Sequence, residues 1–286
     1  MPPNGSGPAW TEPGSGSPPG WVEPGPAPAP QGPTPVGPLG GWRPSSRRQP
    51  RTPLPVPSAP RATLALELSL VLLFAFLPGL PGLLLALLGA SAGSSGGIRE
   101  LTPAIVFSVI DLALAWGPVA LLGYLLVRSG EGRAAIGLGR LRPSDLRMGA
   151  ALWVGSWVLV YVVGTLLSGL GSNQVDFLPK ALPLWFRVVD ALVIAVTAGV
   201  TEEVVVRGYA QTRLEQLRAP TAVVILLPTG LWGLLHLYQG LGPALTILCL
   251  GLAYAAWFHA TRRLWPLVLA HALFDLTQLV LILLLD

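Results

Sequence analysis

From about residue 63 to its end, the chain consists of long apolar runs separated by short stretches rich in arginine. Several runs approach or exceed the roughly 18–20 residues that an α-helix needs to cross a bilayer. Only 11% of the residues are charged, and the mean hydropathy is +0.61. A soluble domain of this size would carry roughly twice that share of charge. We therefore predict an all-α protein, a polytopic bundle of transmembrane helices.

The pattern predicts about seven spans, within a range of six to eight. They cover, to within a few residues, about 63–90, 103–127, 148–170, 184–212, 219–238, 243–260 and 264–285. Pro78 and Pro81 should kink the first span, because proline cannot continue the backbone hydrogen bonds of a helix.

The basic residues predict how the chain is oriented. They cluster before the first span, between spans two and three, after span four and after span six, as Arg43, Arg47, Arg48, Arg51, Arg61, Arg128, Arg133, Arg140, Arg142, Arg147, Arg213, Arg218, Arg262 and Arg263. By the positive-inside rule, these clusters and the N-terminus are cytoplasmic. The net charge of +4 indicates contact with anionic lipids rather than nucleic acid. We expect an integral protein of the plasma membrane, with its C-terminus outside.

Residues 1–61 differ in composition from the rest. They are dominated by Pro, Gly, Ser and Ala, and cannot bury enough apolar area to offset chain entropy. We predict a disordered cytoplasmic tail (1–61) ahead of a helical membrane domain (62–286). The tail contains one motif twice, as Trp10-Thr11-Glu12-Pro13-Gly14 and Trp21-Val22-Glu23-Pro24-Gly25. The motif does not identify a binding partner.

Three charged residues lie close together inside the fourth apolar run. Glu203 and Arg207 are spaced i and i+4, the spacing and order that favour an ion pair on a helix. Glu202 lies about 100° around the helix from Glu203, so it would point elsewhere. Charges at that depth are costly unless they are paired or face a polar cavity. The different directions of the two side chains would suit one structural and one catalytic glutamate. Alternatively, all three residues form a polar cluster that only holds helices together.

Two later runs add further polar groups. His236 lies four residues after Trp232, and His271 and Asp275 share one face of the last span. Depths counted at about 1.5 Å per residue place His236 higher than the others, although Pro228 could bend its segment. We expect Glu202, His236, His271 and Asp275 to share one layer near mid-membrane.

These residues, in this order and spacing, resemble the three motifs of the CPBP (Abi) family. That family comprises intramembrane proteases related to the type II CAAX-processing endopeptidase, and includes bacteriocin self-immunity proteins. Its pattern is Glu-Glu-x-x-x-Arg, Phe-x-x-x-His and His-x-x-x-Asn or Asp, and the similarity covers roughly residues 150–286. Trp232 stands where the family usually has Phe, which keeps an aromatic wall.

The resemblance implies a role for each residue. Glu202 and His236 would hold and deprotonate a water, and His271 with Asp275 would face the scissile carbonyl oxygen. Asp275 can donate a hydrogen bond there only if it is protonated; otherwise it orients His271. Glu203 and Arg207 would brace the site, as would Trp232. The expected substrate is a membrane-embedded or lipid-anchored peptide.

A metal site would use the same residues. Two histidines and a carboxylate are a common catalytic zinc set, so Glu202, His236 and His271 are candidate zinc ligands. The sequence leaves open both a glutamate-dependent and a metal-dependent endopeptidase. A non-catalytic scaffold or self-immunity protein of the same fold is the alternative function. A proton-coupled transporter is a third, but we see none of the internal repeats typical of transporters.

Overall fold

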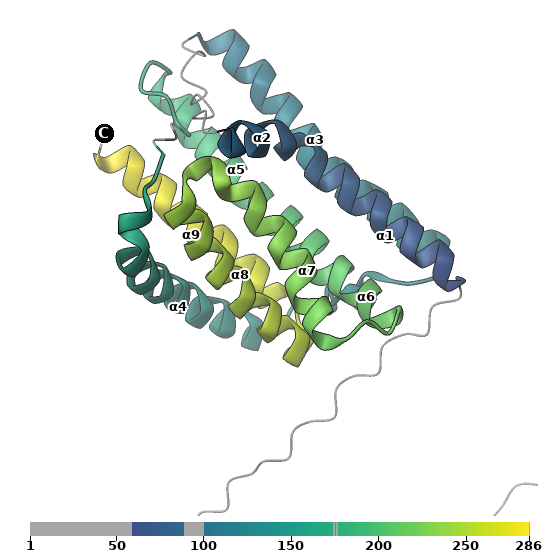
Figure 1. The fold of residues 1–286 in the computed structure, drawn as a ribbon. Helices are drawn as coiled ribbons and strands as arrows, with labels where there is room; N and C mark the ends of the chain where they lie inside the picture. Colours follow the sequence, from purple (N-terminus) through teal and green to yellow (C-terminus); the bar gives the residue numbers. More distant parts are fainter. Residues whose placement is uncertain (1–58, 89–99, 174, 176, 286) are drawn as a thin grey trace, which may run out of the picture. The chain divides into compact units, whose positions relative to one another are not determined.

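The computed structural model describes residues 59–88, 100–173, 175 and 177–285. The predicted tail up to residue 58, with its tryptophan repeat, lies outside the described residues. Within them the chain is helical, which confirms the predicted class (Figure 1). The α-helices are α1 (Arg61–Phe76), α2 (Leu80–Leu87), α3 (Leu101–Arg128), α4 (Pro143–Leu167), α5 (Leu184–Glu202), α6 (Thr212–Gln216), α7 (Thr221–Leu234), α8 (Leu241–Thr261) and α9 (Trp265–Leu285).

Six helical segments of the described chain are long and apolar enough to cross a membrane, which lies within the expected range of six to eight. They are Arg61–Leu85, Leu101–Arg128, Pro143–Leu170, Thr221–Gln239, Leu241–Thr261 and Trp265–Leu285. Their outer faces carry many exposed apolar side chains, including Leu66, Phe107 and Tyr161. Such surface is costly in water and suits lipid. The chain is therefore an integral membrane protein.

The predicted fourth span is a continuous helical segment from Leu184 to Gln216. It begins as α5, changes to a π-helix over Glu203–Gln211, and ends as α6. It is not one of the six segments that are long and apolar enough to cross a membrane. This segment carries the acidic pair, and its π-helix starts at the second acid.

The first predicted span is broken near Pro78 and Pro81, as the sequence predicted. A 3-10 turn at Leu77–Gly79, which contains Pro78, separates α1 from α2. Pro143 is the first residue of α4, where its missing N–H is not needed. The backbone N–H of Arg142 donates to Asp145 Oδ2 at 2.8 Å, which caps the same helix.

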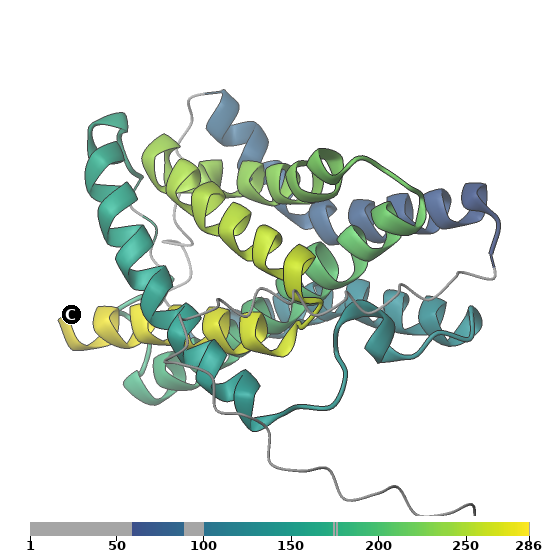
Figure 2. The ribbon, with the colours of Figure 1, turned by 90° about the horizontal axis from the view of Figure 1, so that it is seen from below.

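The site depends on how α9 packs. This helix contacts α5 and α4 extensively, and α7 packs along α8. Figure 2 shows α4 and α9, the teal and yellow helices, crossing each other. Gly199 of α5 allows the closest approach: a Cβ there would lie 2.6 Å from the backbone nitrogen of Ala272. The two helices therefore meet backbone to backbone, one residue from His271.

Candidate active site

The acidic pair lies where α5 changes to the π-helix. Glu203 and Arg207 are fully buried, whereas the Glu202 side chain is 31% exposed. π-helical turns occur frequently at functional sites, because the wider turn re-aims side chains. As expected from the sequence, the two glutamates have different surroundings. One is enclosed by protein and the other borders a cavity.

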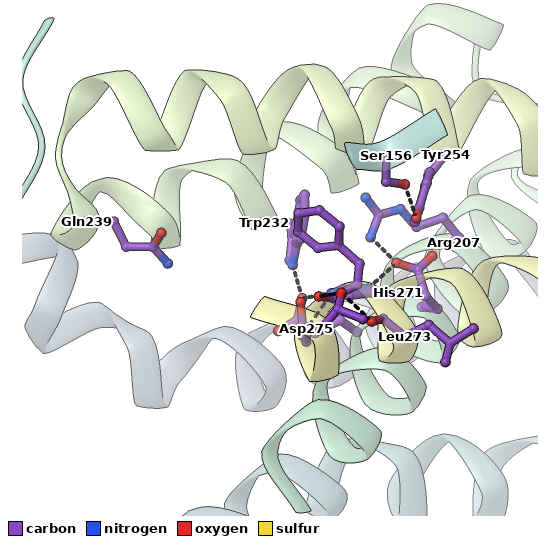
Figure 3. A network of polar contacts seen from close by, with 12 residues as sticks. Ser156, Arg207, Trp232, Gln239, Tyr254, His271, Leu273 and Asp275 are labelled. Atoms are coloured by element: carbon purple, nitrogen blue, oxygen red, sulfur yellow. Dashed lines mark hydrogen bonds and ion pairs between the residues drawn. The ribbon is translucent and has the colours of Figure 1, made fainter. Parts of the chain in front are cut away.

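Glu203 joins two helices through one oxygen. Its Oε1 accepts from Arg207 NH1 at 2.9 Å and lies 2.8 Å from His271 Nδ1 (Figure 3). Because a carboxylate paired with arginine can only accept, His271 Nδ1 carries the proton of that bond. The pair therefore fixes the orientation of the His271 ring and directs its Nε2 away from Glu203.

The Arg207 guanidinium lies between two aromatic rings. Its Cζ is 4.4 Å from the centre of the Trp232 ring and 5.9 Å from that of Tyr254. Tyr254 Oη lies 2.7 Å from Ser156 Oγ, which ties α8 to α4. Gly251 leaves room for this stack, since a Cβ there would lie 2.6 Å from the Trp232 ring and 2.9 Å from Arg207 NH2. Arg207 thus has an ion pair on one side and aromatic faces on the others.

The opposite side of His271 faces two more carboxylates. Its Nε2 lies 3.5 Å from Asp275 Oδ2 and 3.9 Å from Glu202 Oε2. Glu202 Oε2 also accepts a hydrogen bond from the indole N–H of Trp232. The sequence prediction that Glu202, His271 and Asp275 come together is therefore met in the structure.

His236 reaches the same place from a 3-10 turn, Leu235–Gln239, that follows α7. Its Nδ1 lies 2.9 Å from the backbone oxygen of Trp232. A carbonyl oxygen only accepts, so Nδ1 carries the proton, and in the neutral ring the lone pair is on Nε2. The ring centre is 4.8 Å from that of Trp232.

A cavity of about 1140 Å³ connects these groups. It is lined by Glu202, Trp232, His236, His271 and Asp275, together with many apolar residues of α3, α4, α5, α8 and α9. The depth count from the sequence had set His236 apart, but the structure brings all four predicted residues to one cavity. Asp111 and Asp190 line this cavity as well.

The three candidate zinc ligands, Glu202, His236 and His271, all line the cavity. Each histidine uses Nδ1 in a hydrogen bond, which leaves Nε2 for a ligand, as metal-binding histidines do. However, no group of three or more His, Cys, Asp or Glu side chains in the described ranges is placed to hold a metal ion. The side chains as they stand therefore do not form the predicted ligand set, and zinc dependence stays a prediction for experiment.

Sequence reasoning missed the residues that shape the site without reacting. Gly199, Gly251, Tyr254 and Ser156 look like ordinary members of apolar helices in the sequence. Small residues at helix contacts are the one available signal, because they let backbones approach closely in a membrane. His259 lies outside the site, and its Nδ1 is 2.7 Å from Glu215 Oε1.

One comparison with known proteins found a family model that matches the segment carrying these residues. The model for type II CAAX prenyl endopeptidase Rce1-like proteins matches residues 183–277. This segment is shorter than the 150–286 expected from the motifs, and leaves out α4, but it contains all seven motif residues. Neither the search of curated proteins nor that of solved structures found a match. Residues 183–277 thus match the model of the Rce1-like type II CAAX prenyl endopeptidases, in agreement with the resemblance to CPBP proteases.

Proposed function

We propose that this protein is an intramembrane endopeptidase that hydrolyses a peptide bond in a membrane-embedded or lipid-anchored substrate. One observation carries the proposal: Glu202, His236, His271 and Asp275 come from three separate helical segments and line one cavity. The family match supports a protease, and the six apolar helices support an active site within the bilayer.

In this mechanism Glu202 and His236 activate a water. Glu202 is the less buried of the two glutamates, so its carboxylate can reach a water in the cavity. Neutral His236 presents its Nε2 lone pair, because its Nδ1 proton is held by the Trp232 carbonyl. A water that donates to these two groups loses a proton as it attacks the substrate carbonyl, and the proton is later given to the leaving amine.

His271 and Asp275 would stabilise the oxyanion. Three carboxylates and one guanidinium surround the His271 ring. A proton shared between His271 Nε2 and Asp275 reduces this excess negative charge, and excess charge is costly in an apolar site. The same proton provides the hydrogen-bond donor that a developing oxyanion requires. Glu203 and Arg207 hold His271 in place.

The cavity suits the expected substrate class. It is large enough for an extended peptide segment together with an apolar chain, and most of its lining is apolar. Besides Glu202 and Asp275, the cavity is lined by Asp111 and Asp190, and Asp190 is 12 residues before Glu202, or about 18 Å along the helix. We propose the plasma membrane as the location, with a cytoplasmic N-terminus.

Cleavage of a quenched lipidated-peptide library in detergent tests the proposal. We expect Glu202→Gln and His236→Ala each to lower kcat by about 10²–10⁴-fold, because each removes a group that takes part in proton transfer. Asp111→Asn and His259→Ala are the matched controls and should retain most activity. Asp111→Asn removes a carboxylate from the same cavity, and His259→Ala removes a histidine outside it.

The same assay separates the remaining alternatives. Loss of cleavage with a chelator, restored by added zinc, would establish a metal-dependent reaction; chelator-resistant cleavage supports glutamate alone. Full activity in folded Glu202→Gln protein would rule out the proposed mechanism. A scaffold or self-immunity protein needs the charged cluster only for packing, so the amide would leave its function intact.

A further inference from the structure

Trp232 contacts three members of the candidate active site. Its indole N–H donates to Glu202 Oε2, its backbone carbonyl accepts from His236 Nδ1 at 2.9 Å, and its ring stacks on the Arg207 guanidinium. The residue itself is 5% exposed. The sequence suggested only an aromatic wall at this position. The structure shows that the indole nitrogen and the backbone oxygen also bond to polar groups.

Helix α8 packs against the Trp232 ring and fixes its position. A Cβ at Gly251 would lie 2.6 Å from Trp232 Cζ3, so the helix and the ring are in close contact. The ring cannot retreat without displacing α8. A buried indole N–H also needs an acceptor, and Glu202 provides it. Trp232 therefore holds its N–H in a fixed position beside the Glu202 carboxylate, which borders the cavity.

We propose that Trp232 is a positioning residue that determines which oxygen of Glu202 acts as the base. The N–H engages Oε2, and in this proposal Oε1 is left to accept from a water in the cavity. The backbone carbonyl of the same residue keeps the His236 lone pair on Nε2. One residue thus sets both partners of the water. This inference rests on the proposed function, because it assigns a role within that mechanism.

The variant Trp232→Phe distinguishes the contribution of the indole N–H from that of the aromatic ring. Trp232→Phe keeps an aromatic face for Arg207 and the backbone carbonyl for His236; it removes the donor to Glu202 and part of the buried ring volume beside Gly251. A single hydrogen bond to a charged group corresponds to about 10- to 100-fold in rate. We expect kcat to fall by about that factor with KM nearly unchanged, because the substrate does not bind to the indole nitrogen.

The pH profile gives a readout that a packing defect would not produce. The N–H stabilises the ionised form of the base, so its loss should move the acidic limb of the kcat profile to higher pH by about one unit. Trp265→Phe is the matched control. It also loses one indole N–H bond, to the Gly139 carbonyl at 2.7 Å, but lies outside the cavity. Its acidic limb should not move.

A stability cycle tests the contact without any activity. Trp232→Phe, Glu202→Leu and the double variant are compared by thermal unfolding in detergent. If the two side chains interact, the double variant loses less in Tm than the sum of the single losses. Additive losses would overturn the proposal, as would an unchanged kcat and pH profile in Trp232→Phe. Cleavage that survives Glu202→Gln refutes the proposed function, whereas the cycle still decides on the contact.

Discussion

Glu203 and Arg207 are both fully buried, and a buried ion pair is costly to desolvate. Its polar atoms are only partly satisfied, because Glu203 Oε2 and Arg207 Nε and NH2 have no hydrogen-bond partner among the described residues. Here His271 adds a second donor to Glu203, and Trp232 and Tyr254 cover the guanidinium. Removing either charge alone would leave its partner buried and unpaired, which typically costs about 3–5 kcal/mol. Of the doublet, Glu203 is thus held in the buried ion pair, whereas Glu202 lines the cavity.

Asp275 allows a residue-scale test of the oxyanion role. Its Oδ2 lies 3.5 Å from His271 Nε2, on the cavity side. We expect Asp275→Asn to keep most activity, because the amide donates a hydrogen bond without needing a proton. Asp275→Leu has similar size and no donor, and should lower kcat by about 10²–10³-fold. Steady-state kinetics across the pH range measures both.

The two variants also separate the two roles considered for this acid. If protonated Asp275 is the donor, the wild type loses activity at alkaline pH and Asp275→Asn is much less affected there. If Asp275 only orients His271, the two profiles keep the same alkaline limb. Wild-type activity in Asp275→Leu would exclude both roles.

At the scale of the elements, the contact between α5 and α9 determines the site. Gly199 and Ala272 bring the two backbones together, which places His271 beside the acidic pair. The π-helix that begins at Glu203 then sets the directions of the next side chains. Sub-ångström changes at this contact would therefore alter the distances among the reacting groups.

Gly199→Ala should show this sensitivity. The new methyl group would lie 2.6–2.8 Å from atoms of Ala272, so α9 must shift. Overpacking of this kind costs about 1–3 kcal/mol, and we expect a lower Tm together with a large fall in kcat. Gly155→Ala in α4 is the control, since its Cβ would meet nothing within 4 Å. Equal Tm and kcat for the two variants would contradict this account of the contact.

At the scale of the whole molecule, the role of α5 in the membrane sets the sidedness of everything after it. With α5 and its π-helix counted as a crossing, the chain has seven spans and ends outside. Ahead of α5, and independently of it, the positive-inside rule predicts that residue 140, before α4, is cytoplasmic and that residue 172, after it, is outside.

Labelling of single cysteines tests this topology. The chain has one cysteine, Cys249, which is exposed on α8 and is first replaced by alanine. In intact cells, a membrane-impermeant thiol reagent should label Ser172→Cys and spare Arg140→Cys until the cells are opened. Labelling of Arg140→Cys alone would invert the predicted orientation. Labelling of both would show that α4 does not cross.

Much of the architecture could be predicted from the sequence because lipid imposes a strong constraint. Backbone groups in a bilayer must bond within their own segment, so apolar runs of this length become helices. Pro78 likewise fixed the break between α1 and α2. The motif spacing identified the Glu203–Arg207 pair and the residues of the cavity, because i and i+4 positions on a helix are neighbours.

The tertiary structure alone decided how these groups meet. Nothing in the spacing of Trp232 and Glu202 predicts that an indole N–H bonds to the carboxylate, since they belong to different helices. The sequence also did not indicate that Gly199 and Gly251 leave room for close helix contacts, or that a π-helix begins at Glu203. Helix formation is a local property of the chain, whereas the rotation and approach of packed helices depend on every contact surface at once. The sequence by itself therefore determined the membrane helices and the chemical groups, and the packing of α5, α7, α8 and α9 determined that these groups line one cavity.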